Sequence, residues 1–244
     1  MKKYIGITAL IIISIAIIAA TAGCASGGTT TATSSTAATA AANNKALTTT
    51  TSAVKISTTT TAGATGGTIA EILARAASIT SMQFDMVQTN SLVGVQGGNG
   101  TVTTHVWVSG NKVKMDANQN GQEIIQLYDY DAGVMYSYSP AQNAATKSTI
   151  TGTSSYGDPN AILQYNPTTA GTDTINGNLC QIIQYINQGT TFKIWLWEAK
   201  GLVLQEEATN PAAGSYTIAN QNYDFSAIPD STFALPAGVT VNGN

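Results

Sequence analysis

Apolar and polar side chains alternate along most of the chain after residue 80. A period of two residues places successive side chains on opposite faces of a strand, so this pattern predicts β-strands. Short turns that contain Gly or Asn separate most neighbouring runs, and turns of that length join antiparallel strands. We therefore expect one long antiparallel meander. Its strands are predicted at residues 82–89, 101–108, 112–116, 123–129, 134–139, 179–187, 191–198, 202–207 and 215–223.

One helix is predicted before this series of strands, and a second is predicted within it. Apolar residues recur every three or four positions from Ile69 to Ile79, and the preceding Thr68 forms a capping-box pattern with Glu71. A second, short helix is predicted over residues 158–163, where an acid and then a proline occupy positions that favour a helix start. Each helix needs an apolar surface of the sheet to cover.

Several strands carry large apolar side chains on both faces. In residues 191–198, Phe192 and two aliphatic residues share one face, whereas Trp195 and Trp197 share the other. A sheet with one solvated face would show polar residues there. Either helices or barrel closure cover the second face, or a concave face is lined for an apolar ligand, and both alternatives have the same composition. The candidate lining residues are Phe84, Met86, Trp107, Tyr136, Trp195 and Trp197.

The first 23 residues have the pattern of an export signal. Two lysines precede an apolar run over residues 5–20, and small residues at 21–23 lead into Cys24. This resembles the bacterial lipobox, in which the cysteine carries acyl chains such as palmitate and becomes the new N-terminus. Thr21 stands where that pattern usually has leucine. The alternatives are an uncleaved transmembrane helix and a secretory signal cut before a free Cys24.

Residues 24–65 are expected to form the lipidated cysteine followed by a stalk. They consist almost wholly of Thr, Ala, Ser and Gly, without sustained apolar periodicity. Such a segment buries too little apolar surface to offset the entropy of ordering, so we expect it to be disordered. The folded domain is predicted to span residues 66–244. With the lysines at the N-terminus inside, the lipoprotein and the anchored alternatives both hold this domain outside the cytoplasm, at the cell surface or the periplasmic face.

Composition excludes several classes of function. Charged residues make up 9% of the chain, and six basic and 13 acidic residues in 66–244 give that part a formal charge of −7. Nucleic-acid binding is not expected, because it needs clustered Lys and Arg. One histidine, His105, and two cysteines cannot form the usual zinc site, so we expect no metal, no cofactor and no catalytic residues. A Ser–His hydrolase would depend on His105 alone, and no Gly-x-Ser-x-Gly motif is present.

The remaining candidates for chemistry have simpler structural interpretations. Cys180 lies in a strand pattern and is expected to be a small buried apolar residue. Asp129 and Asp131 flank Tyr130 just before a predicted turn, and Glu206 stands beside Glu207. We expect these carboxylates to be turn formers or solvated charges.

The order of several segments resembles the LolA/LolB-like superfamily of extracytoplasmic lipoprotein- and lipid-binding domains. After the first helix these segments are MQF at 82–84, VWVSGNKVKM at 106–115, INGNLC at 175–180, KIWLW at 193–197, GLVL at 201–204 and IPDSTFALPAG at 228–238. The resemblance implies an α+β, mostly β fold: a strongly curved antiparallel sheet, an incomplete barrel, with helices packed on its concave side. It also implies an apolar hollow that holds acyl chains.

We therefore expect a non-enzymatic lipoprotein that is anchored to the membrane through Cys24 and binds a lipid or an acyl chain in a hydrophobic cavity. A tethered protein cannot carry cargo between two membranes, which favours local lipid handling or sensing. The alternative is an envelope-sensing or surface module that binds a protein partner along an edge strand.

Overall fold

The computed structural model describes residues 66–92, 100–119, 121–150 and 159–243, all within one compact unit. The signal peptide, the lipidation of Cys24 and the stalk, all expected within residues 1–65, lie outside the described residues. Over the part of the chain that is described, no helix has the length and apolar character needed to span a membrane.

In the described ranges, twelve strands form a single sheet. All nine predicted strands are present, with ends that differ by a few residues. Three others were missed, β6, β7 and β12, which lie at or next to the two edges of the sheet and lack a regular apolar alternation. The strands are β1 (Ser81–Leu92), β2 (Gly100–Ser109), β3 (Lys112–Gln119), β4 (Gln122–Asp129), β5 (Val134–Ser139), β6 (Ala144–Thr149), β7 (Thr168–Ile175), β8 (Asn178–Asn187), β9 (Thr190–Trp197), β10 (Leu202–Asn210), β11 (Gly214–Asp224) and β12 (Thr240–Asn242).

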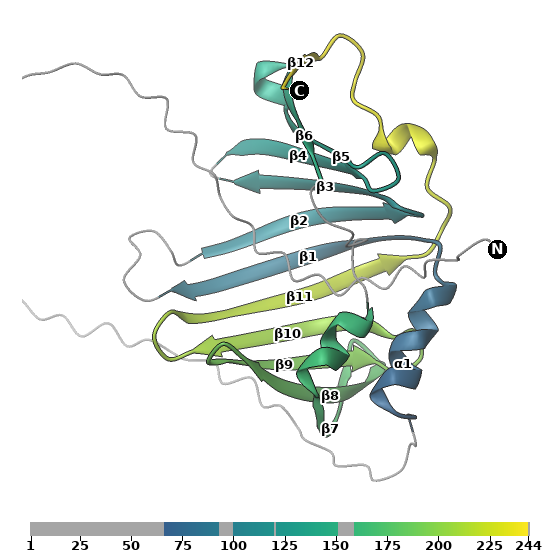
Figure 1. Ribbon diagram of the computed structural model, residues 1–244, viewed down its shortest axis with the longest axis vertical. Coiled ribbons are helices and arrows are strands. Elements are labelled where there is room, and N and C mark those ends of the chain that lie inside the picture. Colours follow the sequence, from purple (N-terminus) through teal and green to yellow (C-terminus); the bar gives the residue numbers. More distant parts are fainter. Residues whose placement is uncertain (1–65, 93–99, 120, 151–158, 244) are drawn as a thin grey trace, which may run out of the picture. The chain divides into compact units, whose positions relative to one another are not determined.

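The strand order corrects the expectation of one continuous meander. β1–β6 form one antiparallel meander and β7–β11 form another, and antiparallel pairing of β1 with β11 joins them (Figure 1). β12 pairs with β6 in the parallel direction, so the sheet is not purely antiparallel. β12 and β7 form the two edges and do not pair with each other, so among the described strands the sheet is not closed into a barrel.

The first predicted helix is present but shorter than the sequence pattern suggests. α1 (Ile69–Arg75) begins at a capping box in which Thr68 and Glu71 each accept a backbone N–H from the other residue. A 3₁₀ turn, η1 (Ala76–Ser78), then ends at Ile79, whose side chain is buried although it lies outside the helix. α1 is the one α-helix among the described residues.

The second predicted helix is a 3₁₀ helix, η3 (Pro159–Tyr165), and its expected N-terminal acid at position 158 lies outside the described residues. Two further 3₁₀ turns are η2 (Pro140–Gln142) and η4 (Asp230–Phe233). Their short length follows from the sequence, because no run of apolar residues at helical spacing surrounds either turn.

α1 and η3 pack on the same face of the sheet, against β8 and β9. We call this the helix-side face and the other the far face. On the helix-side face, Ile72 and Leu73 of α1 and Ile162 of η3 form one buried cluster with strand residues such as Ile194 and Leu196. Burial of this cluster fixes α1, because an isolated helix of seven residues has too few hydrogen bonds to be stable by itself.

Candidate functional site

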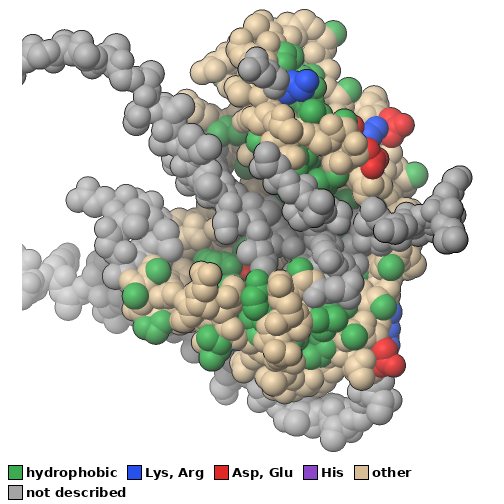
Figure 2. Space-filling view, in the orientation of Figure 1, with side chains coloured by type: hydrophobic (Ala, Val, Ile, Leu, Met, Phe, Trp, Pro, Cys, Tyr) green, Lys and Arg blue, Asp and Glu red, His purple; other side chains and the backbone are tan. Residues whose placement is uncertain are grey.

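The helix-side face continues far beyond the two helices. Side chains directly opposite each other on paired strands point to the same face, so the register of the sheet extends the face from strand to strand. Phe84 on β1 is opposite Val106 on β2, which is opposite Met115 on β3, and all three are buried. Met86 lies on the same face as Phe84 and is also buried. The register thus defines a buried apolar strip that runs from β8 to β3, across strands that lie side by side in Figure 1. In the view of Figure 2, hydrophobic side chains reach the surface in the half of the domain that contains α1, β8 and β9.

One carboxyl group interrupts this strip. Glu206 on β10 is opposite Ile194 on one side and Ile218 on the other, which places it on the helix-side face with 2% of its side chain exposed. The Tyr216 hydroxyl donates to Glu206 Oε1 at 2.6 Å. Burial raises the pKa of Glu206, and the hydrogen bond from Tyr216 opposes that shift. The expectation that Glu206 is a solvated charge was wrong: the strand alternation puts Glu206 on the helix-side face and leaves only Glu207 on the far face.

Aromatic side chains form a wall beside Glu206. Tyr165 of η3, Tyr185 of β8 and Phe192 of β9 stack in order, with ring centroids 5.1 and 4.7 Å apart. In the register of the sheet, Ala208 separates Phe192 from Tyr216. The Tyr185 hydroxyl is buried without a hydrogen-bond partner in the described ranges, and its pKa is raised by burial and then by the nearby Glu206.

Three more polar side chains lie on the same face around Met86. Thr104 on β2 and Asn220 on β11 are directly opposite Met86 on its two sides, and they are 2% and 5% exposed. Gln88 is the next helix-side residue along β1. Thr104 Oγ1, Asn220 Oδ1 and Gln88 Oε1 are each buried without a hydrogen-bond partner among the described residues. A buried polar atom in that state is costly, by about 1–3 kcal/mol.

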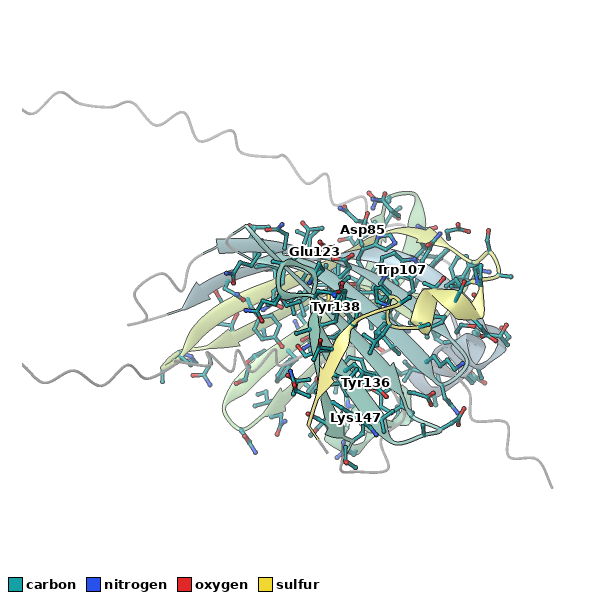
Figure 3. The ribbon with its side chains drawn as sticks, turned by 90° about the horizontal axis from the view of Figure 1, so that it is seen from above. Asp85, Trp107, Glu123, Tyr136, Tyr138 and Lys147 are labelled. Carbon is teal, nitrogen blue, oxygen red and sulfur yellow. The ribbon has the colours of Figure 1, made fainter. Side chains whose placement is uncertain are left out.

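The far face carries a separate chain of polar contacts. His105 Nδ1 is 2.5 Å from Asp85 Oδ1, and Asn222 donates to Asp85 Oδ2 at 2.7 Å. The hydrogen bond from Asn222, and after it His105, hold the pKa of Asp85 below its usual value. His105 also contacts the Trp107 ring edge-on, and Lys114 lies 4.5 Å above that ring. The labelled side chains of Asp85 and Trp107 can be followed in Figure 3.

A second part of the far face surrounds Trp195. Trp195 packs with Cys180 and Leu204, and its indole N–H donates to Asp173 at 3.1 Å. Lys193 lies 4.3 Å above the same ring. Burial raises the pKa of the Cys180 thiol to about 12, which confirms the expectation of an inert buried residue.

A pocket of about 300 Å³ lies on the other half of the sheet, between β3–β5 and the segment that contains η4. Tyr136 and Phe233 line it together with Lys112, which forms an ion pair with Asp230 at 3.9 Å. Asp129 also lines it and accepts the Ala132 backbone N–H, as expected of a turn former.

The structure therefore separates the six lining residues expected from the sequence. Phe84 and Met86 lie on the helix-side face. The register places the four others on the far face, where Tyr136 borders the 300 Å³ pocket: these are Trp107, Tyr136, Trp195 and Trp197.

The polar residues that the sequence reasoning missed are Glu206, Tyr185, Asn220 and Thr104. The only signal in the sequence was a polar residue two positions away from apolar residues along a strand. Glu206, which lies two positions from both Leu204 and Ala208, is an example. Within the ranges that the structure covers, no three His, Cys, Asp or Glu side chains are close enough together to hold a metal ion.

No protein-family model and no curated protein matches the chain. Among solved structures, it is similar to an uncharacterized conserved protein from Thermus thermophilus, with a TM-score of 0.55 and 10% identity over 72% of this chain and 98% of the other. It is also similar to a LolA superfamily protein from Nitrosomonas europaea (TM-score 0.35, 13% identity, 69% of this chain and 98% of the other). A third is the lipoprotein LppX from Mycobacterium tuberculosis (TM-score 0.44, 13% identity, 66% and 96%). At these identities the likeness concerns the fold alone.

Proposed function

We propose that this chain is a lipoprotein of the cell envelope, anchored through acyl chains on Cys24, whose domain binds a lipid or an acyl chain without converting it. The observation that carries the proposal is the buried apolar strip on the helix-side face. α1 and η3 pack against β8 and β9, and the strip continues across β1, β2 and β3. We further propose that the sheet curves around this face, so that the helices occupy its concave side.

Apolar burial alone supplies enough free energy for such binding. Each CH₂ group removed from water contributes about 0.8 kcal/mol, so a chain of about ten such groups contributes roughly 8 kcal/mol, of which about 4 kcal/mol remains at the lower end of the cost of association. The strip offers flexible Met86 and Met115 beside the rigid ring of Phe84. Methionine adapts its shape to irregular apolar partners, which suits a flexible chain. This function needs no nucleophile, no proton transfer and no metal.

Photocrosslinking tests the location of the ligand. The full-length protein is incubated with a fatty acid that carries a diazirine near the end of its chain, irradiated, and mapped by peptide mass spectrometry. We expect crosslinks at Phe84, Met86 and Val106, and loss of these crosslinks under excess unlabelled lipid. Crosslinks confined to the far-face residues Trp107 and Trp195, or no competable crosslink, would refute the proposal.

The anchoring is tested separately. Mass spectrometry of the mature N-terminus is expected to show a chain that begins at Cys24 with acyl groups attached. A chain that retains residues 1–23, or begins at an unmodified Cys24, would contradict anchoring by acylation and leave the ligand-binding proposal to the crosslinking experiment.

A protein partner along an edge strand is the second candidate function. β7 is an edge of the sheet, most of its side chains are exposed, and its sequence contains neither Lys nor Pro, the residues that usually protect such edges. We expect a photoreactive crosslinker on Thr172→Cys, in β7, to capture one defined envelope protein. The same crosslinker on Thr103→Cys, an exposed position in the interior strand β2, is the matched control. Equal capture by both variants would contradict an edge-strand interface.

A further inference from the structure

The unpartnered polar atoms around Met86 are mostly hydrogen-bond acceptors. Asn220 Nδ2 donates to the Val203 carbonyl at 2.9 Å, so its unpartnered atom is the amide oxygen. Gln88 Nε2 donates to Asn90 at 2.9 Å, which leaves the amide oxygen of Gln88 unpartnered in the same way. These two oxygens can only accept, whereas the Thr104 hydroxyl can both donate and accept.

Register places these groups within reach of one small headgroup. Thr104 and Asn220 lie on the strands that flank β1, so about 10 Å separates them, since neighbouring strands are about 4.8 Å apart. Gln88 is two residues from Met86 on the central strand. A headgroup of three carbons with a hydrogen bond at each end spans about that distance.

Glu206 and Tyr185 extend the polar groups toward the helices. Glu206 is on β10, next to the strand that carries Asn220, and Tyr185 is on β8. Tyr216 donates to Glu206, which leaves the carboxyl group able to make further hydrogen bonds. The Tyr185 hydroxyl has no hydrogen-bond partner in the part of the chain that the structure describes, so its proton is free to be donated to a ligand acceptor.

We propose that the helix-side face selects a neutral lipid with a hydroxyl-bearing headgroup, of the glycerol monoester class. Its hydroxyl groups donate to the amide oxygens of Asn220 and Gln88 and exchange hydrogen bonds with Thr104. Its acyl chain lies along the apolar strip beside Phe84 and Val106. The inference rests on the proposed function and adds the chemistry of the ligand to it.

Charge on this face disfavours an anionic headgroup. A carboxylate would face two amide oxygens and Glu206, which repel it. The register directs the four lysines on the described strands to the far face: Lys112, Lys114, Lys147 and Lys193. The Arg75 guanidinium donates to the Glu198 and Gly66 carbonyls, and Lys200 lies over the Phe225 ring. None of the basic residues in the described part of the chain therefore neutralises an anion beside Asn220.

The buried hydroxyl on this face also favours a neutral headgroup over a cationic one. An ammonium group donates to amide oxygens but accepts nothing, so it would leave the proton of the Thr104 hydroxyl without an acceptor. A hydroxyl group satisfies both kinds of atom. The buried Thr104 hydroxyl thus favours a neutral polyol over an amine.

Binding of four probes with the same hexadecyl-length chain tests the selection. The full-length protein is titrated with monopalmitoylglycerol, palmitate, methyl palmitate and hexadecylamine at neutral pH, and each Kd is measured by native mass spectrometry. We expect monopalmitoylglycerol to bind at least about tenfold more tightly than each of the others. Equal affinities, or tighter binding of palmitate or of the amine, would overturn the headgroup proposal and leave apolar binding intact. Absence of binding by all four would overturn the proposed function itself.

Matched variants test the residues. Thr104→Val keeps the side-chain shape and removes the hydroxyl on the helix-side face, and Thr103→Val does the same on the far face of the same strand. We expect Thr104→Val to weaken monopalmitoylglycerol binding several-fold with methyl palmitate binding unchanged, and Thr103→Val to affect neither. An equal change for both probes in Thr104→Val, or no change for either, would contradict a headgroup contact. Thermal unfolding of both variants confirms that each is folded at the temperature of the titration.

Discussion

Glu206 is a buried carboxyl group on the helix-side face, with one described hydrogen bond, from Tyr216. Desolvation disfavours its charged form, so its pKa in the folded protein lies above the usual value of 4.5. The folded state therefore binds more protons than the unfolded state at intermediate pH, and Glu206 lowers stability as pH rises above about 4.5 and through its folded pKa.

Glu206→Gln removes this decrease in stability with rising pH, because glutamine does not titrate. Glutamine has nearly the same shape, and its amide oxygen still accepts from Tyr216. We expect the variant to be more stable than the natural protein by about 1 kcal/mol or more at about pH 8, and the advantage to disappear near about pH 4, where the carboxyl group is protonated in both states. Urea unfolding at several pH values measures the difference.

Glu207→Gln is the control, because Glu207 is the neighbouring carboxylate on the far face. We expect its effect on the free energy of unfolding to be within about 0.5 kcal/mol at all pH values. If Glu206→Gln shows no more pH dependence than Glu207→Gln, the carboxyl group of Glu206 is not desolvated as described.

Single residues show where sequence reasoning stopped. The burial of Cys180 and the turn role of Asp129 follow from local patterns, and both are confirmed. The partner of His105 could not be predicted, because Asp85 lies on the neighbouring strand and only the register brings the two together. Glu206 was misassigned because acidic residues in a strand are usually solvated, and the sequence alone does not say which of Glu206 and Glu207 faces the helices.

At the scale of elements, the contact between α1 and the β9–β10 turn decides where the helix lies. Gly201 in that turn has a φ of +69°, and a Cβ atom there would be 2.3 Å from the Ile72 carbonyl oxygen and 3.0 Å from the Ala76 nitrogen. Both are backbone atoms at or just after α1, so they cannot move without shifting the helix. The absence of a side chain at Gly201 thus allows α1 to reach the apolar strip.

Gly201→Ala tests this contact, with Gly189→Ala as the matched control. Gly189 has a similar φ of +75°, but nothing lies within 4 Å of its Cβ position. Both variants incur the cost of a left-handed alanine, about 1–2 kcal/mol, and only Gly201→Ala also displaces α1. We expect Gly201→Ala to destabilise the protein by at least about 2 kcal/mol more in chemical denaturation. Equal losses would show that α1 does not depend on this turn.

Element prediction from the sequence succeeded where a regular pattern was present. The capping box at Thr68 and Glu71 and the nine apolar-alternating strands are confirmed. β7 and β12 are edge strands, with one neighbour each and little burial, so nothing in their sequences has to alternate. They form because β8 and β6 offer free backbone groups, which is a property of the neighbouring strands.

At the scale of the whole domain, β1 and β11 hold the two meanders together. Their pairing joins residues about 130 positions apart in the chain, for example Val87 and Ala219. Ala219 is opposite Val87 on one side and Gln205 on the other, so its strand is hydrogen-bonded along both edges. Loss of this seam would separate the two halves of the apolar strip.

Ala219→Pro should break the seam. Proline removes a ladder hydrogen bond and disrupts a central strand, at a cost of about 3 kcal/mol or more. Ala170→Pro is the control, since Ala170 lies at a register shift in the edge strand β7, where proline is tolerated. We expect Ala219→Pro to abolish cooperative unfolding and crosslinking at Met86, and Ala170→Pro to retain both. Retention of the Met86 crosslinks in Ala219→Pro would show that the ligand needs one meander only.

The sequence by itself determined the elements with a strong repeat: the capped helix, the apolar strands and the turns between them. Local chemistry suffices there, because alternation, capping and turn formation act over a few residues. Only the tertiary structure decided the pairing of β1 with β11, the face on which each aromatic side chain lies and the group of acceptors around Met86. Alternation along a strand shows that the two faces of the sheet differ. Which of the two faces the helices cover depends on packing between residues more than a hundred positions apart in the chain.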